Sequence, residues 1–378
     1  MSSVQPTLAD PTVRWCADAL AGEALERLAE AIPGTVDGLL QCAEKEGVTA
    51  LLAQCLAMDA TLQPAALVPV TAALRGHAKA LSMLELSRRA RARHVLGVLQ
   101  EADIPVLVLK GMALGYWLYP SPVQRPGVDV DLLLPDVAAA EVAVAALLAN
   151  GYRLADGVWP AQSSGFEATL HFASRHDHEV DLHWRLLNHA RLAQGFEFSE
   201  LLATAVPLPA LATGACGLGR VHALAHALLH RVANASSGRQ NRLIWLYDIH
   251  LLARACVAAD WRAFLELCKQ KAITQPCLDG LAACHAVLHT PLPEDLLATL
   301  HQQGEAEHWH IGALSQRGAL DRAHWAALRW QQRLPWMWRK LLPPPSFMRY
   351  RYGVQGWLGL MIAYARRLWV GACRALGG

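Results

Sequence analysis

The sequence predicts an α+β fold, in which a small mixed sheet lies along the chain between two helical regions. Apolar residues recur at three- and four-residue spacing in residues 12–101 and again from Ser199 onward, which is typical of amphipathic helices. Residues 101–190 instead contain short runs rich in Val and Leu, bounded by Pro and Gly, which favour strands. Hydrophobic residues make up 53% and charged residues 17% of the 378 residues. The chain can therefore bury a core in two or three packed units, and disorder is not expected.

Residues 1–100 form the expected N-terminal helical region. Helical spacing is found in three segments rich in Ala, Leu, Arg and Glu, at 13–32, 35–57 and 80–102. Pro33 and Gly34 separate the first two segments, because proline and glycine interrupt helices.

Residues 101–190 form the expected central module. The predicted order is strand, helix, strand, helix and a two-stranded hairpin, at 105–109, 112–119, 128–134, 136–150 and 166–186. The second helix begins near Asp136 and ends before Gly151, which suit the two ends of a helix. The hairpin is expected to turn tightly at residues 175–177.

Residues 191–378 form the expected C-terminal helical domain. Its clearest helical patterns lie at 219–233, 242–256 and 261–271. The run LLPPPS at 341–346 cannot be helical throughout, because proline lacks an amide donor, so a helix break is expected there.

The end of this domain is basic and rich in tryptophan. Residues 322–378 hold ten Lys or Arg, no Asp or Glu, and six of the 13 Trp. Three interpretations are open: a buried helical end, a segment that docks peripherally on anionic membrane, or one that contacts a polyanion such as nucleic acid. No transmembrane span is expected, since the best candidate, 352–365, is shorter than the roughly 20 residues that cross a bilayer.

The cysteine pattern indicates a reducing compartment. The nine Cys are scattered singly, without zinc-type spacing, and are expected to be buried free thiols. The N-terminus lacks the basic and apolar regions of a signal peptide. The expected location is the cytoplasm, with peripheral membrane attachment as a second possibility.

The clearest candidate site is the run GVDVDLLL, which contains Asp129 and Asp131. Residues two apart in a strand point to the same face, so the two carboxylates project together. At about 6–7 Å they repel by roughly 3 kcal/mol at an effective dielectric constant of 20. A hard divalent cation offsets this repulsion, and Mg²⁺ takes one or two carboxylates together with substrate phosphates. The pair therefore indicates a site for Mg²⁺ or Mn²⁺.

Lys110 and Gly111 form a second candidate element, at the expected turn between a strand and a helix. Glycine lets a phosphate approach the backbone, the start of a helix offers N–H groups, and lysine adds positive charge. Arg125, in the following loop, either contacts phosphate or pairs with an acidic residue. Asp248, in a C-terminal helical pattern, caps or pairs within the helical domain.

The run HEVDLHWRL adds a third polar strand face. Alternation places Glu179, Asp181, His183 and Arg185 on one face and apolar residues on the other. Asp181 could provide a third carboxylate, and His183 could hydrogen-bond a phosphate or orient Asp181.

Together these motifs resemble a known family. The sequence LVLKGMALGYWLYPSPVQRPGVDVDLLL, followed by GY and EVDLHWRL, is similar to the uncharacterised nucleotidyltransferase family of bacterial biosynthetic clusters, within the polymerase-β-like superfamily. The matching motifs are a lysine-glycine turn, a proline-flanked arginine, an Asp-x-Asp strand and an Asp-Leu-His-Trp strand. The wider superfamily usually has Gly-Ser at the turn, where this chain has Lys110 and Gly111.

The resemblance implies that a polymerase-β-like sheet at 101–190 is the catalytic module. It implies catalytic metal ligands at Asp129, Asp131 and Asp181, and nucleotide or phosphate contacts at Lys110, Gly111, Arg125 and His183. The implied enzyme uses Mg²⁺ or Mn²⁺ to transfer a nucleotidyl group from ATP or another nucleoside triphosphate to an unidentified acceptor, in a bacterial biosynthetic or modification pathway. Two alternatives stay open: a catalytically weak nucleotide-binding partner or scaffold, and a toxin-like enzyme that modifies RNA or protein.

Overall fold

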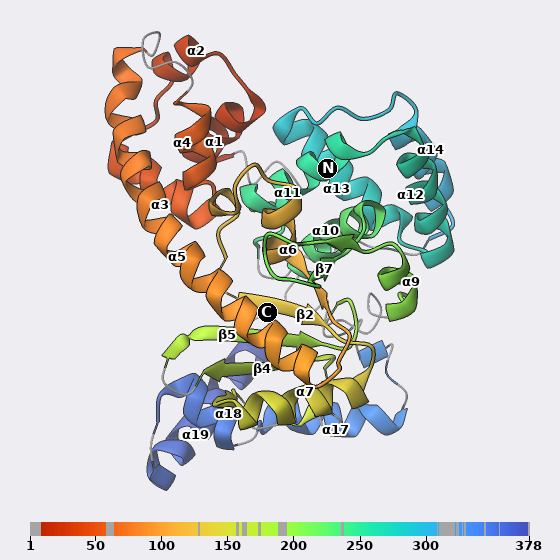
Figure 1. The fold of residues 1–378 in the computed structure, drawn as a ribbon. Coiled ribbons are helices and arrows are strands. Elements are labelled where there is room, and N and C mark those ends of the chain that lie inside the picture. The colour runs from red at the N-terminus through yellow and green to blue at the C-terminus, as the bar shows by residue number, and fades with distance from the viewer. Residues whose placement is uncertain are drawn as a thin grey trace. The chain divides into compact units, whose positions relative to one another are not determined.

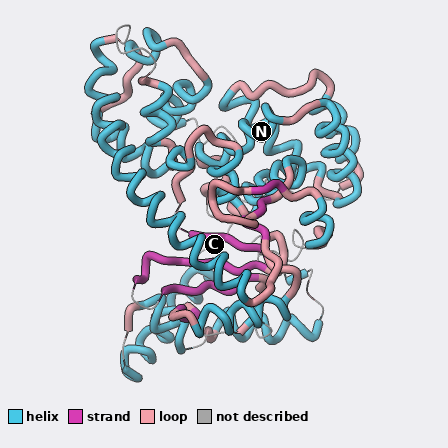
Figure 2. The backbone as a smooth tube through the Cα atoms, viewed as in Figure 1, coloured by secondary structure: helices cyan, strands magenta, loops and turns pink. Residues whose placement is uncertain are grey.

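Helices predominate in the computed structural model, and its strands are short (Figures 1 and 2). The structure describes residues 9–57, 64–127, 129–155, 159–160, 165–172, 175–187, 195–235, 238–307, 309, 322, 325–326, 328, 330–343, 345–354 and 356–376. Helices and a mixed arrangement of strands together make the fold α+β, as the sequence predicts.

The chain forms two compact units whose segments alternate along the sequence. Unit 1 consists of Met1–Arg93, Leu107–Gly127 and Gly195–Leu320. Unit 2 consists of His94–Val106, Val128–Gln194 and Asp321–Gly378. The three consecutive regions expected from the sequence, 1–100, 101–190 and 191–378, stay a prediction of domain organisation.

Unit 1 opens with five helices. They are α1 (Pro11–Ala21), α2 (Leu25–Glu30), α3 (Val36–Glu46), α4 (Thr49–Cys55) and α5 (Val68–Glu101), whose end belongs to unit 2. The helices expected at 13–32 and 35–57 are each divided in two, because Gly22 and Gly47 adopt left-handed backbone conformations that end α1 and α3. The third expected helix is correct but begins earlier, at Val68.

The middle of unit 1 contains its short strands. The elements are β1 (Leu107–Val108), α6 (Lys110–Trp117), the short 3₁₀ helix η3 (Pro122–Gln124), β6 (Val206–Pro207) and β7 (Cys216–Gly217). Strand β1 pairs with β7 in parallel, and β6 pairs with β7 antiparallel. The expected strand at 105–109 is therefore shorter than predicted, and the helix expected from Met112 already begins at Lys110.

The C-terminal part of unit 1 is helical. It contains α9 (Phe198–Ala203), α10 (Arg220–Ala233), α11 (Leu243–Ala255), α12 (Ala258–Lys271), α13 (Thr274–Leu288) and α14 (Leu296–Gly304). Helices α10, α11 and α13 pack against one another around buried leucines, among them Leu228, Leu246 and Leu281. The helices expected at 219–233, 242–256 and 261–271 are confirmed as α10, α11 and α12.

Unit 2 holds the longer strands. They are β2 (Asp129–Leu133), β3 (Tyr152–Leu154), β4 (Glu167–Phe172) and β5 (Arg175–His183), with helix α7 (Val137–Ala149) between β2 and β3. The strands lie in the order β3-β4-β5-β2; β5 and β2 run parallel, and the other neighbours run antiparallel. The turn expected at 175–177 is wrong. Residues 175–177 belong to β5, which begins at Arg175, and Arg175 pairs with Phe172 of β4.

The four strands of unit 2 have one apolar and one polar face. Val130 and Leu132 of β2 lie opposite Val180 and Leu182 of β5, and all four side chains are buried. The alternate residues of these strands form the polar face, which includes Asp131 and the side chains opposite it. Helix α7, which follows β2, packs against β3.

The C-terminal part of unit 2 contains α17 (Trp330–Leu341), α18 (Pro345–Tyr352) and α19 (Gly356–Leu376). The helix break expected at 341–346 is confirmed, since α17 ends and α18 begins within this proline run. Helices α18 and α19 contact each other, and Met348 and Ala363 are buried there. Every helix in the described part of the chain is too short or too polar to cross a lipid bilayer.

Asp136 should stabilise unit 2 through the start of α7. Its side chain accepts a hydrogen bond of 2.8 Å from the backbone N–H of Ala139, which would otherwise lack a partner within the helix. Asp136→Ala is expected to lower the free energy of unfolding by about 1 kcal/mol, whereas Asp136→Asn, which keeps the acceptor, should change it by only a few tenths. Urea unfolding followed by circular dichroism measures both, and equal stabilities of the two variants would contradict the capping role.

Candidate functional site

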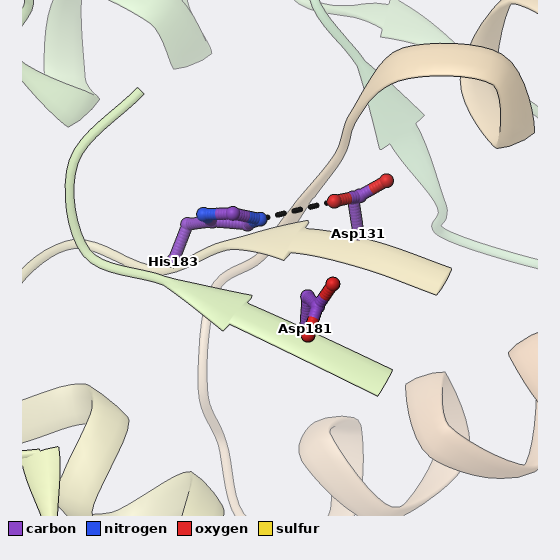
Figure 3. Close-up of side chains that lie close together, drawn as sticks. All are labelled: Asp131, Asp181 and His183. Atoms are coloured by element: carbon purple, nitrogen blue, oxygen red, sulfur yellow. Dashed lines mark hydrogen bonds and ion pairs between the residues drawn. The ribbon is translucent and has the colours of Figure 1, made fainter. Parts of the chain in front are cut away.

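The parallel pairing of β2 with β5 brings three functional side chains together. In this register Asp131 lies opposite Asp181, and Leu133 lies opposite His183. Ligand atoms of Asp131, Asp181 and His183 all lie within 4.8 Å of one another (Figure 3). This cluster, called the Asp131 cluster below, is the one group of metal-ligating side chains found among the described residues.

His183 is held between two carboxylates. Its Nε2 lies 3.0 Å from Oδ1 of Asp131, and because a carboxylate only accepts, Nε2–H is the donor. Its Nδ1 lies 3.5 Å from Oε2 of Glu167, which is too long for a good hydrogen bond, so this contact is electrostatic. The sequence indicated that His183 orients Asp181 or contacts a phosphate; the structure shows its hydrogen bond to Asp131.

Asp181 is a partly buried carboxyl with one short hydrogen bond. Oγ1 of Thr169, directly opposite on β4, donates to Oδ1 of Asp181 over 2.6 Å. Burial, and next the charge of Asp131, raise the pKa of Asp181 from 3.8 to about 7, and the hydrogen bond from Thr169 offsets only part of this. Near neutral pH the carboxyl of Asp181 is therefore stabilised by binding a proton, or by a positive charge placed beside it.

The strand residues beside the Asp131 cluster are also acidic. Asp129 lies opposite Glu179, one pleat along the same pair of strands. Burial, and next the charges of Asp129 and Asp131, raise the pKa of Glu179. The sequence grouped Asp129 with Asp131 and Asp181, whereas the structure groups His183 with these two residues. A ligand role for Asp129 stays a prediction.

The sequence analysis did not identify two residues beside the site, Glu167 and Thr169 of β4. Both lie opposite β5, at His183 and Asp181 respectively. The run FEATLHFAS was expected to be a strand, and its alternation places Glu167, Thr169 and His171 on one face. That alternation was the available signal, but the sequence alone does not show which residues of β5 they oppose.

The donor set of the Asp131 cluster fits a divalent cation. Two carboxylates suit Mg²⁺ and Mn²⁺, and an imidazole is also accepted by Mn²⁺ and by later transition metals. The raised pKa of Asp181 is consistent with this fit, because two carboxylates this close together, one buried and one partly buried, need a positive charge or a proton beside them. Asp131, Asp181 and His183 are therefore the residues that could hold a metal.

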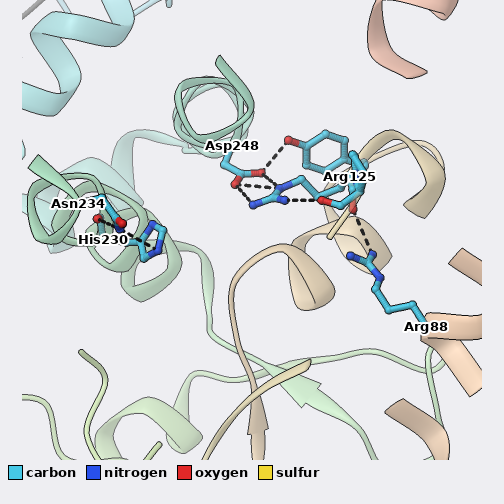
Figure 4. Close-up of polar contacts among 7 residues, drawn as sticks. Arg88, Arg125, His230, Asn234 and Asp248 are labelled. Carbon is cyan, nitrogen blue, oxygen red and sulfur yellow. Dashed lines mark hydrogen bonds and ion pairs between the residues drawn. The ribbon is translucent and has the colours of Figure 1, made fainter. Parts of the chain in front are cut away.

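The predicted phosphate contacts outside β5 belong to unit 1, where Arg125 forms a buried ion pair. Its Nη2 lies 2.7 Å from Oδ2 of Asp248, and its Nε donates to both oxygens of the same carboxylate (Figure 4). The hydroxyl of Tyr119 donates to Asp248, and Arg88 donates to the backbone oxygen of Arg125. Of the two roles considered for Arg125, the structure shows the pairing with an acidic residue. Its contact with phosphate stays a prediction.

Gly111 provides space for this ion pair. A Cβ atom at Gly111 would lie 2.5 Å from Nη1 of Arg125, far closer than side chains tolerate. The glycine is therefore needed for the packing of Arg125 against α6, a reason that the sequence did not reveal. Lys110, the first residue of α6, has a φ of 51°, a left-handed conformation that costs a non-glycine residue roughly 1 kcal/mol. The phosphate roles of Lys110 and Gly111 stay predictions.

The fold and the Asp131 cluster together describe an α+β protein with a candidate cation site. A sequence profile of the uncharacterised nucleotidyltransferase family matches residues 33–289. The match covers most of the chain, and the chain belongs to this family, which confirms the resemblance read from its motifs. No curated protein gives a significant match.

Replacing Gly111 should weaken the packing around Arg125. Gly111→Ala is expected to lower the free energy of unfolding by about 1–3 kcal/mol, because the new methyl group displaces a buried guanidinium. Gly76→Ala is the matched control: it also lies in a helix, but its Cβ would meet nothing within 4 Å, so stability should stay the same or rise by about 1 kcal/mol. Thermal or urea unfolding distinguishes them, and equal effects would show that Gly111 has no packing role.

Asp181 should make the stability of the cation-free protein depend on pH. Its folded-state pKa of about 7 lies above the ordinary 3.8, so the folded protein binds this proton more tightly and loses stability as pH rises through that window. Between about pH 4 and pH 7, the wild type should lose up to roughly 1.4 kcal/mol per pH unit relative to Asp181→Asn. Urea unfolding in a chelating buffer measures both profiles; parallel profiles would mean that Asp181 ionises normally.

Proposed function

We propose that this protein transfers nucleotidyl groups with the help of a divalent cation bound at the Asp131 cluster. The observation that carries the proposal is the close approach of Asp131, Asp181 and His183 on two neighbouring parallel strands. Membership of the uncharacterised nucleotidyltransferase family supports the type of reaction.

In this proposal each residue of the cluster has a distinct part. Asp131 and Asp181 hold the cation, because their carboxylates project from adjacent strands at the same level. His183 orients Asp131 through its hydrogen bond, and Thr169 orients Asp181. Glu167 adds negative charge beside Nδ1 of His183, on the side of the ring away from Asp131. These contacts restrict the carboxylate rotamers before any ligand binds, which lowers the cost of assembling the site.

The bound cation would supply charge neutralisation and a Lewis acid for the phosphates of a nucleoside triphosphate. Mg²⁺ would take the two carboxylates and leave His183 on Asp131, whereas Mn²⁺ would also accept the imidazole. The reaction breaks the bond between the α- and β-phosphates, joins the α-phosphate to a nucleophilic oxygen of the acceptor, and releases pyrophosphate. The displaced acceptor proton passes to solvent or to a nearby base.

The finer parts of the proposal come from the resemblance. The donor would be ATP or another nucleoside triphosphate, and the acceptor would belong to a bacterial biosynthetic or modification pathway in the cytoplasm. Asp129 would add a further carboxylate, and Lys110, Gly111 and Arg125 would contact phosphate. Lys110→Met tests the last group without disturbing the ion pair of Arg125 with Asp248.

Transfer of a label from nucleoside triphosphates tests the proposal. The full chain is incubated with Mg²⁺ or Mn²⁺, nucleotides labelled at the α-phosphate, and a bacterial extract as the source of acceptors. Incorporation of label with release of pyrophosphate is expected. Asp131→Asn and Asp181→Asn should each lower the rate by on the order of 10²-fold or more, because the cation loses a ligand. The control Asp136→Asn changes an Asp of the same unit outside the cluster and should keep wild-type activity.

Two results would contradict the proposal. Label transfer that survives Asp131→Asn would place the chemistry elsewhere. Tight binding of Mn²⁺ and nucleotide in calorimetry, with no transfer to any fraction of the extract, would instead favour the scaffold alternative.

A further inference from the structure

Helix α17 exposes a continuous apolar stripe. The stripe consists of Trp330, Leu334, Met337, Trp338 and Leu341, all of which are exposed. At 3.6 residues per turn, these side chains lie within an arc of about 100°. Trp336 lies outside this arc and contacts Trp325, with ring centroids 5.8 Å apart. The stripe is therefore distinct from the face through which α17 packs.

Helix α19 repeats this arrangement over a greater length. Its exposed apolar residues are Trp357, Leu358, Met361, Ile362, Leu368 and Trp369. The opposite side of the helix contains the buried Ala363. Tyr364 flanks the stripe, and its hydroxyl donates to the backbone oxygen of Pro343. The tryptophans are almost completely solvated: Trp330 is 74% exposed, Trp357 76% and Trp369 72%. An isolated exposed leucine is ordinary, but two apolar stripes that together contain four exposed tryptophans indicate an interaction surface.

The charge around these stripes is of one sign. Residues 322–378 contain ten Lys or Arg and no Asp or Glu. Exposed Arg349 lies on α18, and exposed Arg366 lies on α19 at the edge of the stripe. The family match ends at residue 289, so this surface lies outside the part of the chain that the family defines. A partner with an anionic surface and an apolar interior would match both the positive charge and the exposed apolar stripes.

We propose that the exposed stripes of α17 and α19 dock on the surface of an anionic lipid bilayer. Apolar side chains would enter the boundary between headgroups and acyl chains, tryptophans would lie at that boundary, and arginines would contact the phosphates. Nucleic acid matches the charge but offers no apolar layer for Leu358, Met361 and Ile362. A second copy of this chain matches the apolar stripes but would bring two wholly basic segments together, which is repulsive.

The same residues determine that the helices lie along the membrane. Arg366 and Arg367 occur in the middle of α19, where a membrane-spanning helix would place them in hydrocarbon. The helices of the described residues also lack a stretch long and apolar enough to cross a bilayer. This arrangement would hold the nucleotidyltransferase at a membrane surface, whatever its acceptor.

Flotation of the full chain with lipid vesicles tests the proposal. Vesicles of phosphatidylcholine mixed with phosphatidylglycerol should bind the protein, vesicles of phosphatidylcholine alone should bind it at least about tenfold more weakly, and added salt should weaken binding. The double variant Leu358→Glu, Met361→Glu should reduce binding to the anionic vesicles by about tenfold or more, because charged groups replace the inserted apolar ones.

A matched control separates the stripe from general effects of charge. Met83→Glu with Leu84→Glu makes the same chemical change on α5, at 69% and 62% exposure against 59% for Met361 and 60% for Leu358. Its vesicle binding should stay within about twofold of wild type. The proposal is overturned if anionic vesicles do not bind, or if both double variants bind equally. It is also overturned if the α19 variant instead abolishes binding to an oligonucleotide, or abolishes self-association seen by light scattering.

Discussion

The parallel register between β2 and β5 is the constraint on which the candidate site depends. It places Asp131 beside Asp181, and Leu133 beside His183. A slip of one residue would turn the carboxylates toward the apolar side and expose Val130 and Leu132 to solvent. The burial of those apolar residues therefore fixes the register of β2 against β5. The same register holds the Asp131 cluster together.

Two aspartates in this chain, the buried Asp248 and the partly buried Asp181, show how differently a shielded charge can be compensated. Asp248 is paired with the guanidinium of Arg125 and accepts a further hydrogen bond from Tyr119, so its charge is compensated by side chains of the protein. Asp181 accepts from Thr169 and faces Asp131, and its pKa rises to about 7. Among the described residues, Asp181 has no such pairing with an arginine. That contrast is the physical basis for the candidate cation site.

Local patterns in the sequence predicted the long elements well. The alternation in VDVDLLL and in HEVDLHWRL indicated β2 and β5, and the helical spacing indicated α7 and α10–α12. Strands β3, β6 and β7 were missed because two or three residues carry no detectable period. The turn expected at 175–177 was misplaced because these polar residues belong to β5, where a register shift lets Arg175 pair with Phe172, and strand pairing is not a local property. Asp131 and Asp181 could be identified because each lies in a local alternating pattern. The contacts of Glu167 and Thr169 could not, because they depend on how β4 pairs with β5. The pairing of Arg125 with Asp248 joins residues that are 123 positions apart.

Anomalous X-ray scattering from crystals grown with Mn²⁺ and a non-hydrolysable nucleoside triphosphate tests the central claim most directly. If the Asp131 cluster is the cation site, the Mn²⁺ peak will lie at about 2.0–2.2 Å from carboxylate oxygens of both Asp131 and Asp181, and near the triphosphate. A Mn²⁺ peak bound to the triphosphate but away from these two residues, or a bound triphosphate with no cation between Asp131 and Asp181, would contradict the account.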